Sequence, residues 1–113
     1  MKELHLICEA HLDPVWLWEW EEGASAAVST FQSAANLADQ FDYIFCHNEV
    51  SLYKYIADYA PDLFEKIKQL IKAGKWHVIG GWYLQPDANM PSGESFIRHA
   101  QVGHKYFMDN FGE

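Results

Sequence analysis

Three apolar runs alternate with helical segments along this chain, and this alternation constrains the fold more than any other feature of the sequence. The runs are residues 4–10, 43–47 and 75–80. Each is short and bounded by polar or turn-forming residues, which is typical of buried strands. Strands that alternate with helices form a parallel sheet joined by right-handed crossovers. The sequence therefore predicts an α/β fold with parallel strands.

Four helical segments separate and follow these strands. One crossover helix is predicted between the first two strands, because small and apolar residues recur there at helical spacing: Ala24, Ala27, Val28, Phe31, Ala34, Ala35 and Ala38. Residues 51–59 predict a second helix. Pro61 opens a third, whose apolar stripe consists of Leu63, Phe64, Ile67, Leu70 and Ile71. Ser92 is placed to cap a last helix, whose buried face would carry Phe96, Ala100, Gly103 and Phe107. The predicted order is βαβααβα.

The net charge indicates which partners the chain can bind, and the cysteines indicate the compartment in which it works. The 113 residues have a net charge of -8 and only eight Lys and Arg, whereas binding to phosphate groups depends on clustered basic side chains. We therefore expect no nucleic acid and no membrane as partner. No run approaches the roughly 20 apolar residues of a membrane span. Cys8 and Cys46 lie singly in apolar runs, which favours reduced thiols and a cytoplasmic protein.

Polar and aromatic residues gather where each predicted strand ends. In parallel sheets, ligands bind beyond the carboxyl ends of the strands. The side chains at these three ends are His11, Asp13 and Trp16, then His47, Asn48 and Glu49, then Trp82, Gln85, Asp87 and Asn89. Their convergence predicts a ligand site on one rim of the sheet. The pair Gly80 and Gly81 at the third end indicates a close backbone approach or a positive φ angle. A simple tight turn and room for a ligand explain it equally well.

His11 and Asp13 are the candidate metal ligands. Residues two apart in an extended backbone point to the same side, and imidazole nitrogen and carboxylate oxygen both suit zinc. Zinc normally takes three or four protein ligands, so two are not a site, and Asp87, His47 and Glu49 could complete it from neighbouring strand ends. A structural His beside a turn-forming Asp explains the pair equally well. Trp16 or a neighbouring indole could stack on the apolar face of a sugar.

Several motifs of the chain together resemble a known family. They are His11-Leu-Asp-Pro-Val-Trp16, Phe45-Cys-His-Asn-Glu49 followed by Tyr53, Gly74-Lys-Trp-His-Val-Ile-Gly-Gly-Trp82, and Gln85-Pro-Asp-Ala-Asn89 followed by Pro91-Ser-Gly-Glu94. In this order they closely resemble the start of the catalytic domain of family 38 glycoside hydrolases, the zinc-dependent α-mannosidases. The resemblance covers nearly the whole chain.

The resemblance implies a retaining hydrolase of mannose-containing oligosaccharides on a (β/α)7 barrel. Residues 1–113 would be the N-terminal part of that domain, about three βα units. Carried over from the family, His11 and Asp13 would bind Zn2+ and Trp16 would form a wall of the sugar subsite. By their place on the rim, Trp82 and Asp87 are further candidates for sugar contact, and His47 and Glu49 are candidates to support the ligands from behind. A structural turn explains Glu49 and Asp87 equally well. The nucleophile, the acid/base and the other zinc ligands match no position here, so we expect no catalytic residue in this chain and no activity from it alone.

Two other functions are compatible with the same residues. A non-catalytic carbohydrate-binding module would keep the rim aromatics and bind mannosides without metal. Another metal-dependent carbohydrate hydrolase or deacetylase would also use a His-x-Asp pair. Because three strands leave open apolar edges, self-association into a homo-oligomer is also expected.

Overall fold

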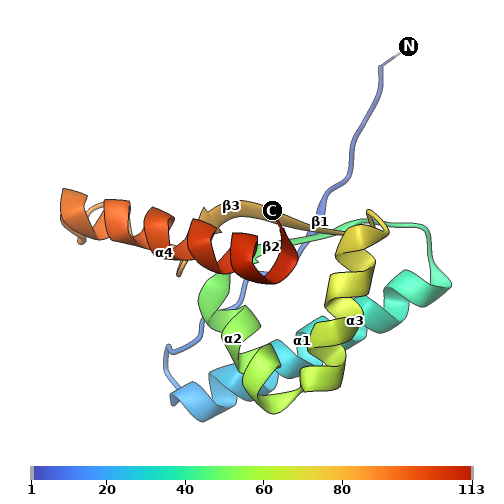
Figure 1. Cartoon of the computed structure of the whole chain (residues 1–113), viewed down its shortest axis with the longest axis horizontal. Coiled ribbons are helices and arrows are strands. Elements are labelled where there is room, and N and C mark those ends of the chain that lie inside the picture. The colour runs from blue at the N-terminus through green and yellow to red at the C-terminus, as the bar shows by residue number, and fades with distance from the viewer. Residues whose placement is uncertain (1, 113) are drawn as a thin grey trace.

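The computed structural model describes residues 2–112 as a three-stranded parallel sheet with four helices (Figure 1). The strands lie in the order β1 (Cys8–Glu9), β2 (Phe45–Glu49) and β3 (Trp76–Trp82). Helix α1 (Trp20–Gln40) connects β1 to β2, α2 (Val50–Tyr59) and α3 (Pro61–Lys72) connect β2 to β3, and α4 (Gly93–Phe111) follows β3. The predicted order of elements and the parallel pairing are confirmed.

The expected portion of a (β/α) barrel is wrong for this structure. The three strands form an open sheet with β1 and β3 at its edges. Two helices, not one, lie between β2 and β3, so the chain does not repeat a simple βα unit. The helices α1, α2 and α3 contact one another as a cluster. A small parallel sheet with four helices is therefore the correct description.

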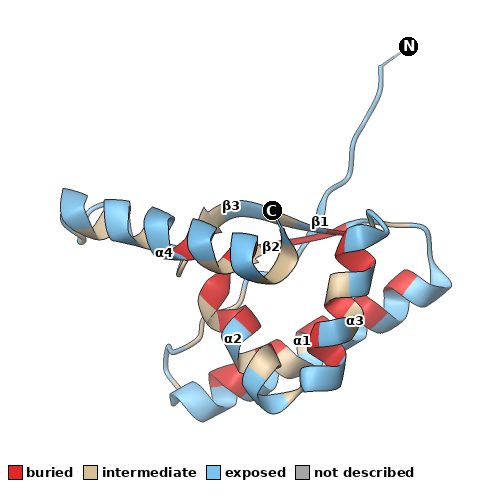
Figure 2. Cartoon of the chain, viewed as in Figure 1, coloured by how far each residue is buried: buried red, intermediate tan, exposed pale blue. Residues whose placement is uncertain are grey.

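The first strand is also shorter and more exposed than its sequence predicts. β1 comprises two residues, and its pairing with β2 is limited to Cys8 opposite Phe45 and Glu9 opposite Cys46. Leu4, Leu6 and Ile7 are largely exposed, with relative exposures of 83%, 83% and 73%. Figure 2 shows this N-terminal segment exposed along its length, running away from the sheet. An apolar run becomes a buried strand only where other residues cover it.

The core lies between β2, β3 and the helix cluster, as the buried ribbon in Figure 2 shows. All five apolar residues predicted for α3 are buried, and so are the alanines and Phe31 predicted for α1, while Val28 is half-buried. Phe31 makes edge contacts with Phe45, Tyr53 and Trp76, at ring-centroid distances of 6.3, 5.2 and 5.3 Å. The Trp76 indole donates to the Tyr53 hydroxyl at 2.8 Å. These rings define the centre of the fold.

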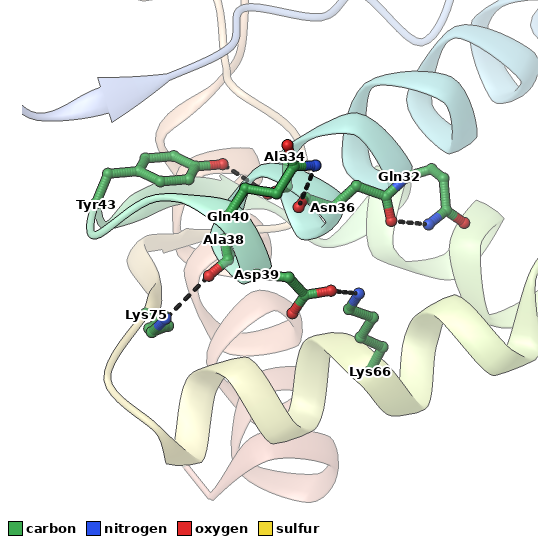
Figure 3. A network of polar contacts seen from close by, with 9 residues as sticks. All are labelled: Gln32, Ala34, Asn36, Ala38, Asp39, Gln40, Tyr43, Lys66 and Lys75. Atoms are coloured by element: carbon green, nitrogen blue, oxygen red, sulfur yellow. Dashed lines mark hydrogen bonds and ion pairs between the residues drawn. The ribbon is translucent and has the colours of Figure 1, made fainter.

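The end of the sheet away from the predicted site is held by polar contacts of α1 (Figure 3). Tyr43, just before β2, donates its hydroxyl to the carbonyl of Ala34 at 2.6 Å. Lys75, just before β3, donates to the carbonyl of Ala38 at 2.9 Å. Lys66 of α3 forms an ion pair with Asp39 of α1. These contacts hold the segments that lead into β2 and β3 against α1, and they hold α3 against α1.

Helix α4 begins as predicted, but its predicted buried face is confirmed only in part, since Phe96 is half-buried. Ser92 caps it, because its side chain accepts the Ser95 N–H at 3.2 Å. Gly103 and Phe107 are buried, whereas Ala100 is exposed. A Cβ atom on Gly103 would lie 2.0 Å from the carbonyl oxygen of Gly81, so this glycine allows α4 to approach the end of β3. Within residues 2–112, no helix is long and apolar enough to cross a membrane.

Candidate functional site

A hollow of about 370 Å³ lies at the carboxyl ends of all three strands. Its lining comes from the segment after β1, from the last residue of β2 and from the loop after β3. The lining residues are His11, Asp13, Pro14, Val15, Trp16, Glu49, Leu84, Gln85, Pro86 and Asp87. Five of the seven residues predicted for the site therefore meet in one hollow, and His47 and Trp82 lie outside its lining.

His11 and Asp13 form the exposed side of this hollow. The His11 Nε2 and Asp13 Oδ1 atoms are 3.3 Å apart, so the two side chains face one point, as their spacing predicts. Their side chains are 66% and 41% exposed. The indole of Trp18 donates to the Asp13 carbonyl at 3.3 Å and ties the segment back on itself. Both candidate ligands are accessible to a bound ion or substrate.

Trp16 lies beside this pair with its ring largely in solvent. Its relative exposure is 67%, which is high for a side chain of this size. The ring is therefore free to stack on a ligand in the hollow. Trp20, by contrast, packs against Tyr55 and Tyr59 of α2, with centroids 6.3 Å away in each case.

Glu49 forms the buried side of the hollow. Its relative exposure is 3%, and its Oε1 accepts the Gln85 N–H at 2.8 Å. Burial raises the pKa of this carboxyl, an effect that the hydrogen bond from Gln85 opposes. The strand pairing is irregular between His47 and Glu49, where Glu49 lies opposite Trp82. Glu49 thus connects the end of β2 to the loop after β3.

His47 lies behind Glu49 in the core. Its Nε2 is 3.7 Å from Glu49 Oε2, and its ring meets Phe31 at a centroid distance of 5.0 Å. Among residues 2–112, neither ring nitrogen has a partner at full hydrogen-bonding geometry. Burial lowers the pKa of His47 to about 4, an effect that the Ala10 backbone opposes and His11 reinforces. His47 is therefore neutral at pH 7.

The two remaining candidates, Asp87 and Trp82, differ in position. Asp87 lines the hollow, and its Oδ1 accepts the N–H groups of Asn89 and Met90 at 2.7 and 3.2 Å. One carboxylate oxygen thus shapes its own turn. Trp82 packs instead against Phe96 and His99 of α4, with centroids 6.0 and 6.5 Å away. Gly80 and Gly81 have φ angles of +82° and +78°, which confirms one alternative predicted for the double glycine.

The side chains at the hollow meet the requirements of a metal site only in part. An imidazole and a carboxylate that face one point are ligands that zinc accepts. Within the range 2–112, however, no group of three or more His, Cys, Asp or Glu side chains is placed to hold an ion. His47 and Glu49 are buried together, while Asp87 is engaged in its turn. The described residues thus bring together two candidate ligands, where a tetrahedral zinc site needs four.

Close packing at Gly23 is a feature of the site that the sequence did not indicate. A Cβ atom there would lie 2.0 Å from the carbonyl oxygen of Pro14, so this glycine lets α1 seat the segment that carries His11 and Asp13. A glycine within a helix pattern is a signal for such an approach, but it does not name the partner.

The fold of this chain matches a part of two solved structures. The crystal structure of an α-mannosidase from Enterococcus faecalis superposes with a TM-score of 0.82 at 20% identity, covering 92% of this chain and 12% of that one. A second Enterococcus faecalis structure, of a protein in glycosyl hydrolase family 38, gives a TM-score of 0.76, also at 20% identity, over 91% of this chain and 12% of that one. At this identity the likeness concerns the fold.

The sequence identifies the family. The family model described as glycosyl hydrolases family 38 N-terminal domain matches residues 1–113, and the chain belongs to this family. Alpha-mannosidase G of Dictyostelium discoideum is 31% identical over 91% of this chain and 10% of its own length. Alpha-mannosidase of Saccharomyces cerevisiae is 31% identical over 94% and 10%. The chain thus spans about a tenth of the length of the curated relatives it matches.

Proposed function

We propose that this chain forms part of the substrate-binding rim of an α-mannosidase that removes terminal mannose from oligosaccharides with retention. The observation that carries the proposal is the single hollow at three strand ends, lined by His11, Asp13, Trp16, Glu49 and Asp87. Membership of family 38 and the names of the relatives support it. Retention requires two carboxyl groups about 5 Å apart. By the resemblance, both belong to parts of a longer polypeptide.

In this proposal His11 and Asp13 supply two of the ligands of a zinc ion. Their 3.3 Å approach and their exposure support that role. The other ligands would come from outside this chain, and the chain alone would bind zinc weakly. A bound zinc ion can orient sugar hydroxyls and stabilise developing negative charge. Glu49 and His47 support the site from below by holding the neighbouring loop and the core.

Trp16 and Asp87 are the proposed sugar contacts. The exposed Trp16 ring offers an apolar surface on which the ring of a mannose can stack. Asp87 can use Oδ2 for sugar hydroxyls while Oδ1 keeps its turn. Trp82 contributes through its packing against α4, which supports the wall of the hollow. The sequence-based role of Trp82 as a direct sugar contact has no support from this packing.

Activity of the longer polypeptide tests the proposal. We expect it to hydrolyse an aryl α-mannoside in a chelator-sensitive manner. Loss of supporting groups around a metal costs about 10–100-fold, so His11→Ala and Asp13→Ala should cost at least about a hundredfold in kcat/KM. Trp16→Ala should raise KM by about tenfold, because a stacking contact is lost. His104→Ala, exposed on α4, is the control.

Two results would reject this function. An active His11→Ala enzyme would exclude His11 as a zinc ligand. Mannoside binding by this chain that survives chelator and His11→Ala, without hydrolysis by the longer polypeptide, would favour the carbohydrate-binding module instead. Turnover by the 113-residue chain alone, abolished by His11→Ala, would contradict our expectation that it is inactive.

The proposed compartment is the cytoplasm. Cys8 and Cys46 lie on neighbouring strands as free thiols, which is usual in a reducing environment. Self-association through exposed apolar groups stays a prediction. Sedimentation of the chain at several concentrations would measure it.

A further inference from the structure

Three consecutive residues after β3 are each held through the backbone. The Tyr83 carbonyl oxygen accepts the Ser51 N–H at 2.9 Å, and the Gln85 backbone N–H donates to Glu49 Oε1 at 2.8 Å. Between them, the Leu84 N–H donates to Nδ1 of His99 at 3.3 Å. Pro86 and Asp87, which line the hollow, follow directly. The wall of the hollow therefore begins at a segment clamped between α4 and the junction of β2 with α2.

His99 makes both polar and ring contacts with this segment. Its ring is half-buried, 6.5 Å from the Trp82 centroid and 6.4 Å from the Tyr83 centroid. Because Nδ1 accepts this hydrogen bond, it is a ring nitrogen without a proton. His99 is not part of the lining of the hollow. Any effect it has on a ligand there must pass through the loop.

We propose that His99 is a positioning residue that fixes residues 84–87 in the mannoside-binding hollow by accepting the Leu84 N–H. Leu84 and Gln85 are consecutive, and their amides are bonded to side chains of different elements. Loss of the His99 bond leaves the Tyr83–Leu84 peptide held on one side only, through the Tyr83 carbonyl and Ser51, so the peptide can tilt and shift Pro86 and Asp87. The proposal rests on the proposed function only for its consequence in substrate binding. The hydrogen bond from the Leu84 N–H to His99 does not depend on the proposed function.

Two variants separate the hydrogen bond from the packing of the ring. His99→Phe keeps an aromatic ring beside Trp82 and Tyr83 but offers no acceptor. His99→Asn removes the ring but places an amide oxygen near the position of Nδ1. A role in packing alone would make His99→Asn the more damaging change. If the hydrogen bond positions the loop, His99→Phe should displace the loop and weaken substrate binding more than His99→Asn does.

The experiment uses the longer polypeptide, with His104→Ala as the control for a histidine lost from α4. A hydrogen bond contributes about tenfold at most, so His99→Phe should speed exchange of the Leu84 amide and raise KM for an aryl α-mannoside by about that factor. We expect kcat to change by less than about twofold, because His99 does not touch the substrate. His99→Asn should restore both exchange and KM.

Unchanged exchange at Leu84 in His99→Phe would overturn the anchor. Faster exchange with an unchanged KM would overturn the positioning role. Failure of His99→Asn to restore either quantity would assign the effect to packing and also overturn the proposal. A wild-type enzyme without mannosidase activity would reject the proposed function, and amide exchange in the two variants would then decide the anchor alone.

Discussion

The two sides of the hollow differ in how they are attached to the fold. On the β2 and β3 side, Glu49 is buried and bonded to Gln85, and the loop beyond is anchored at three backbone positions. On the β1 side, His11 and Asp13 are exposed and follow a strand of two residues. The side that carries the candidate metal ligands is thus the less anchored one. The candidate metal ligands and the buried contacts of the hollow therefore lie on different sides.

This division means that substitutions on the two sides should affect different measurements. Changes on the β2 and β3 side alter buried contacts, so they should lower the free energy of unfolding. Changes on the β1 side remove exposed groups, so they should alter ligand binding and leave the free energy of unfolding nearly unchanged. Each of the following predictions tests that contrast.

Removal of a tryptophan should give the largest difference between the two sides in the free energy of unfolding. Trp76 is fully buried and donates to Tyr53, so Trp76→Ala should lower the free energy of unfolding by about 4 kcal/mol. Trp16→Ala removes an exposed ring and should change it by less than about 0.5 kcal/mol. Urea unfolding of the chain measures both. Similar losses in the two variants would show that the β1 side is as firmly packed as the core.

Acid should destabilise the fold through His47. Its pKa is lowered to about 4 in the fold, while a free imidazole titrates near 6.5, so only the unfolded chain takes up this proton between those values. Stability is therefore lost as the pH falls from about 6.5 to 4, by up to about 3 kcal/mol. Glu49 opposes this loss, because its raised pKa makes the folded chain take up a proton first.

His47→Phe removes this titration while keeping a ring in the core. Urea unfolding between pH 7 and 4 should then show a flatter loss of stability than in the wild type. His104→Ala, which removes an exposed histidine on α4 that does not influence the pKa of His47, is the matched control. An unchanged slope in His47→Phe would mean that other groups dominate acid unfolding.

Substitution of two glycines tests the contrast, because each of them packs equally closely against a backbone carbonyl oxygen. The Cβ of Gly103→Ala would lie 2.0 Å from the Gly81 oxygen, and that of Gly23→Ala 2.0 Å from the Pro14 oxygen. Gly103→Ala should lower stability by about 2 kcal/mol, because β3 cannot move away. Gly23→Ala should cost less than about 1 kcal/mol, because the segment after β1 can move and alanine favours the helix. Thermal unfolding should rank the two in this order.

Gly23→Ala should nevertheless be the more harmful change to the site. Displacing Pro14 also displaces Asp13 beside it, so mannoside turnover by the longer polypeptide should fall while the fold persists. Gly93→Ala is a control for both, because its Cβ would meet nothing within 4 Å. If Gly23→Ala unfolded the chain and Gly103→Ala did not, the assignment of the two sides would be reversed.

The smallest effect on stability is expected at the metal pair. Asp13→Asn removes a charge that is 41% exposed, so the free energy of unfolding should change by less than about 0.5 kcal/mol. Zinc uptake by the chain, measured by calorimetry, should fall below detection. Retention of zinc in Asp13→Asn would indicate that the ion binds elsewhere.

Periodicity in the sequence was enough to predict the helices, because a helix with one buried face must repeat its apolar residues every three to four positions. The stripe of α3 from Leu63 to Ile71 shows this, as all of its predicted members are buried. The capping role of Ser92 could be predicted because a cap is a local contact. The gathering of side chains at strand ends could be predicted from parallel topology.

The remaining features of the fold and the site depend on contacts whose partners the sequence does not indicate. The run at 4–10 has the composition of a strand, but its burial depends on what packs against it. The approach of Gly103 to Gly81 joins positions 22 residues apart. The bonds from Leu84 to His99 and from Gln85 to Glu49 join backbone groups to distant side chains. Such pairs follow from the three-dimensional arrangement alone.

The short pairing of β1 also bears on how tightly any ligand can be held. Opening of an edge strand with two paired residues requires little free energy, so we expect a fraction of molecules to have His11 and Asp13 away from the other strand ends. Apparent affinity is the intrinsic affinity multiplied by the fraction of molecules in the docked state. Residues that only lengthen the pairing of β1, and never touch a ligand, would therefore tune the affinity of the site.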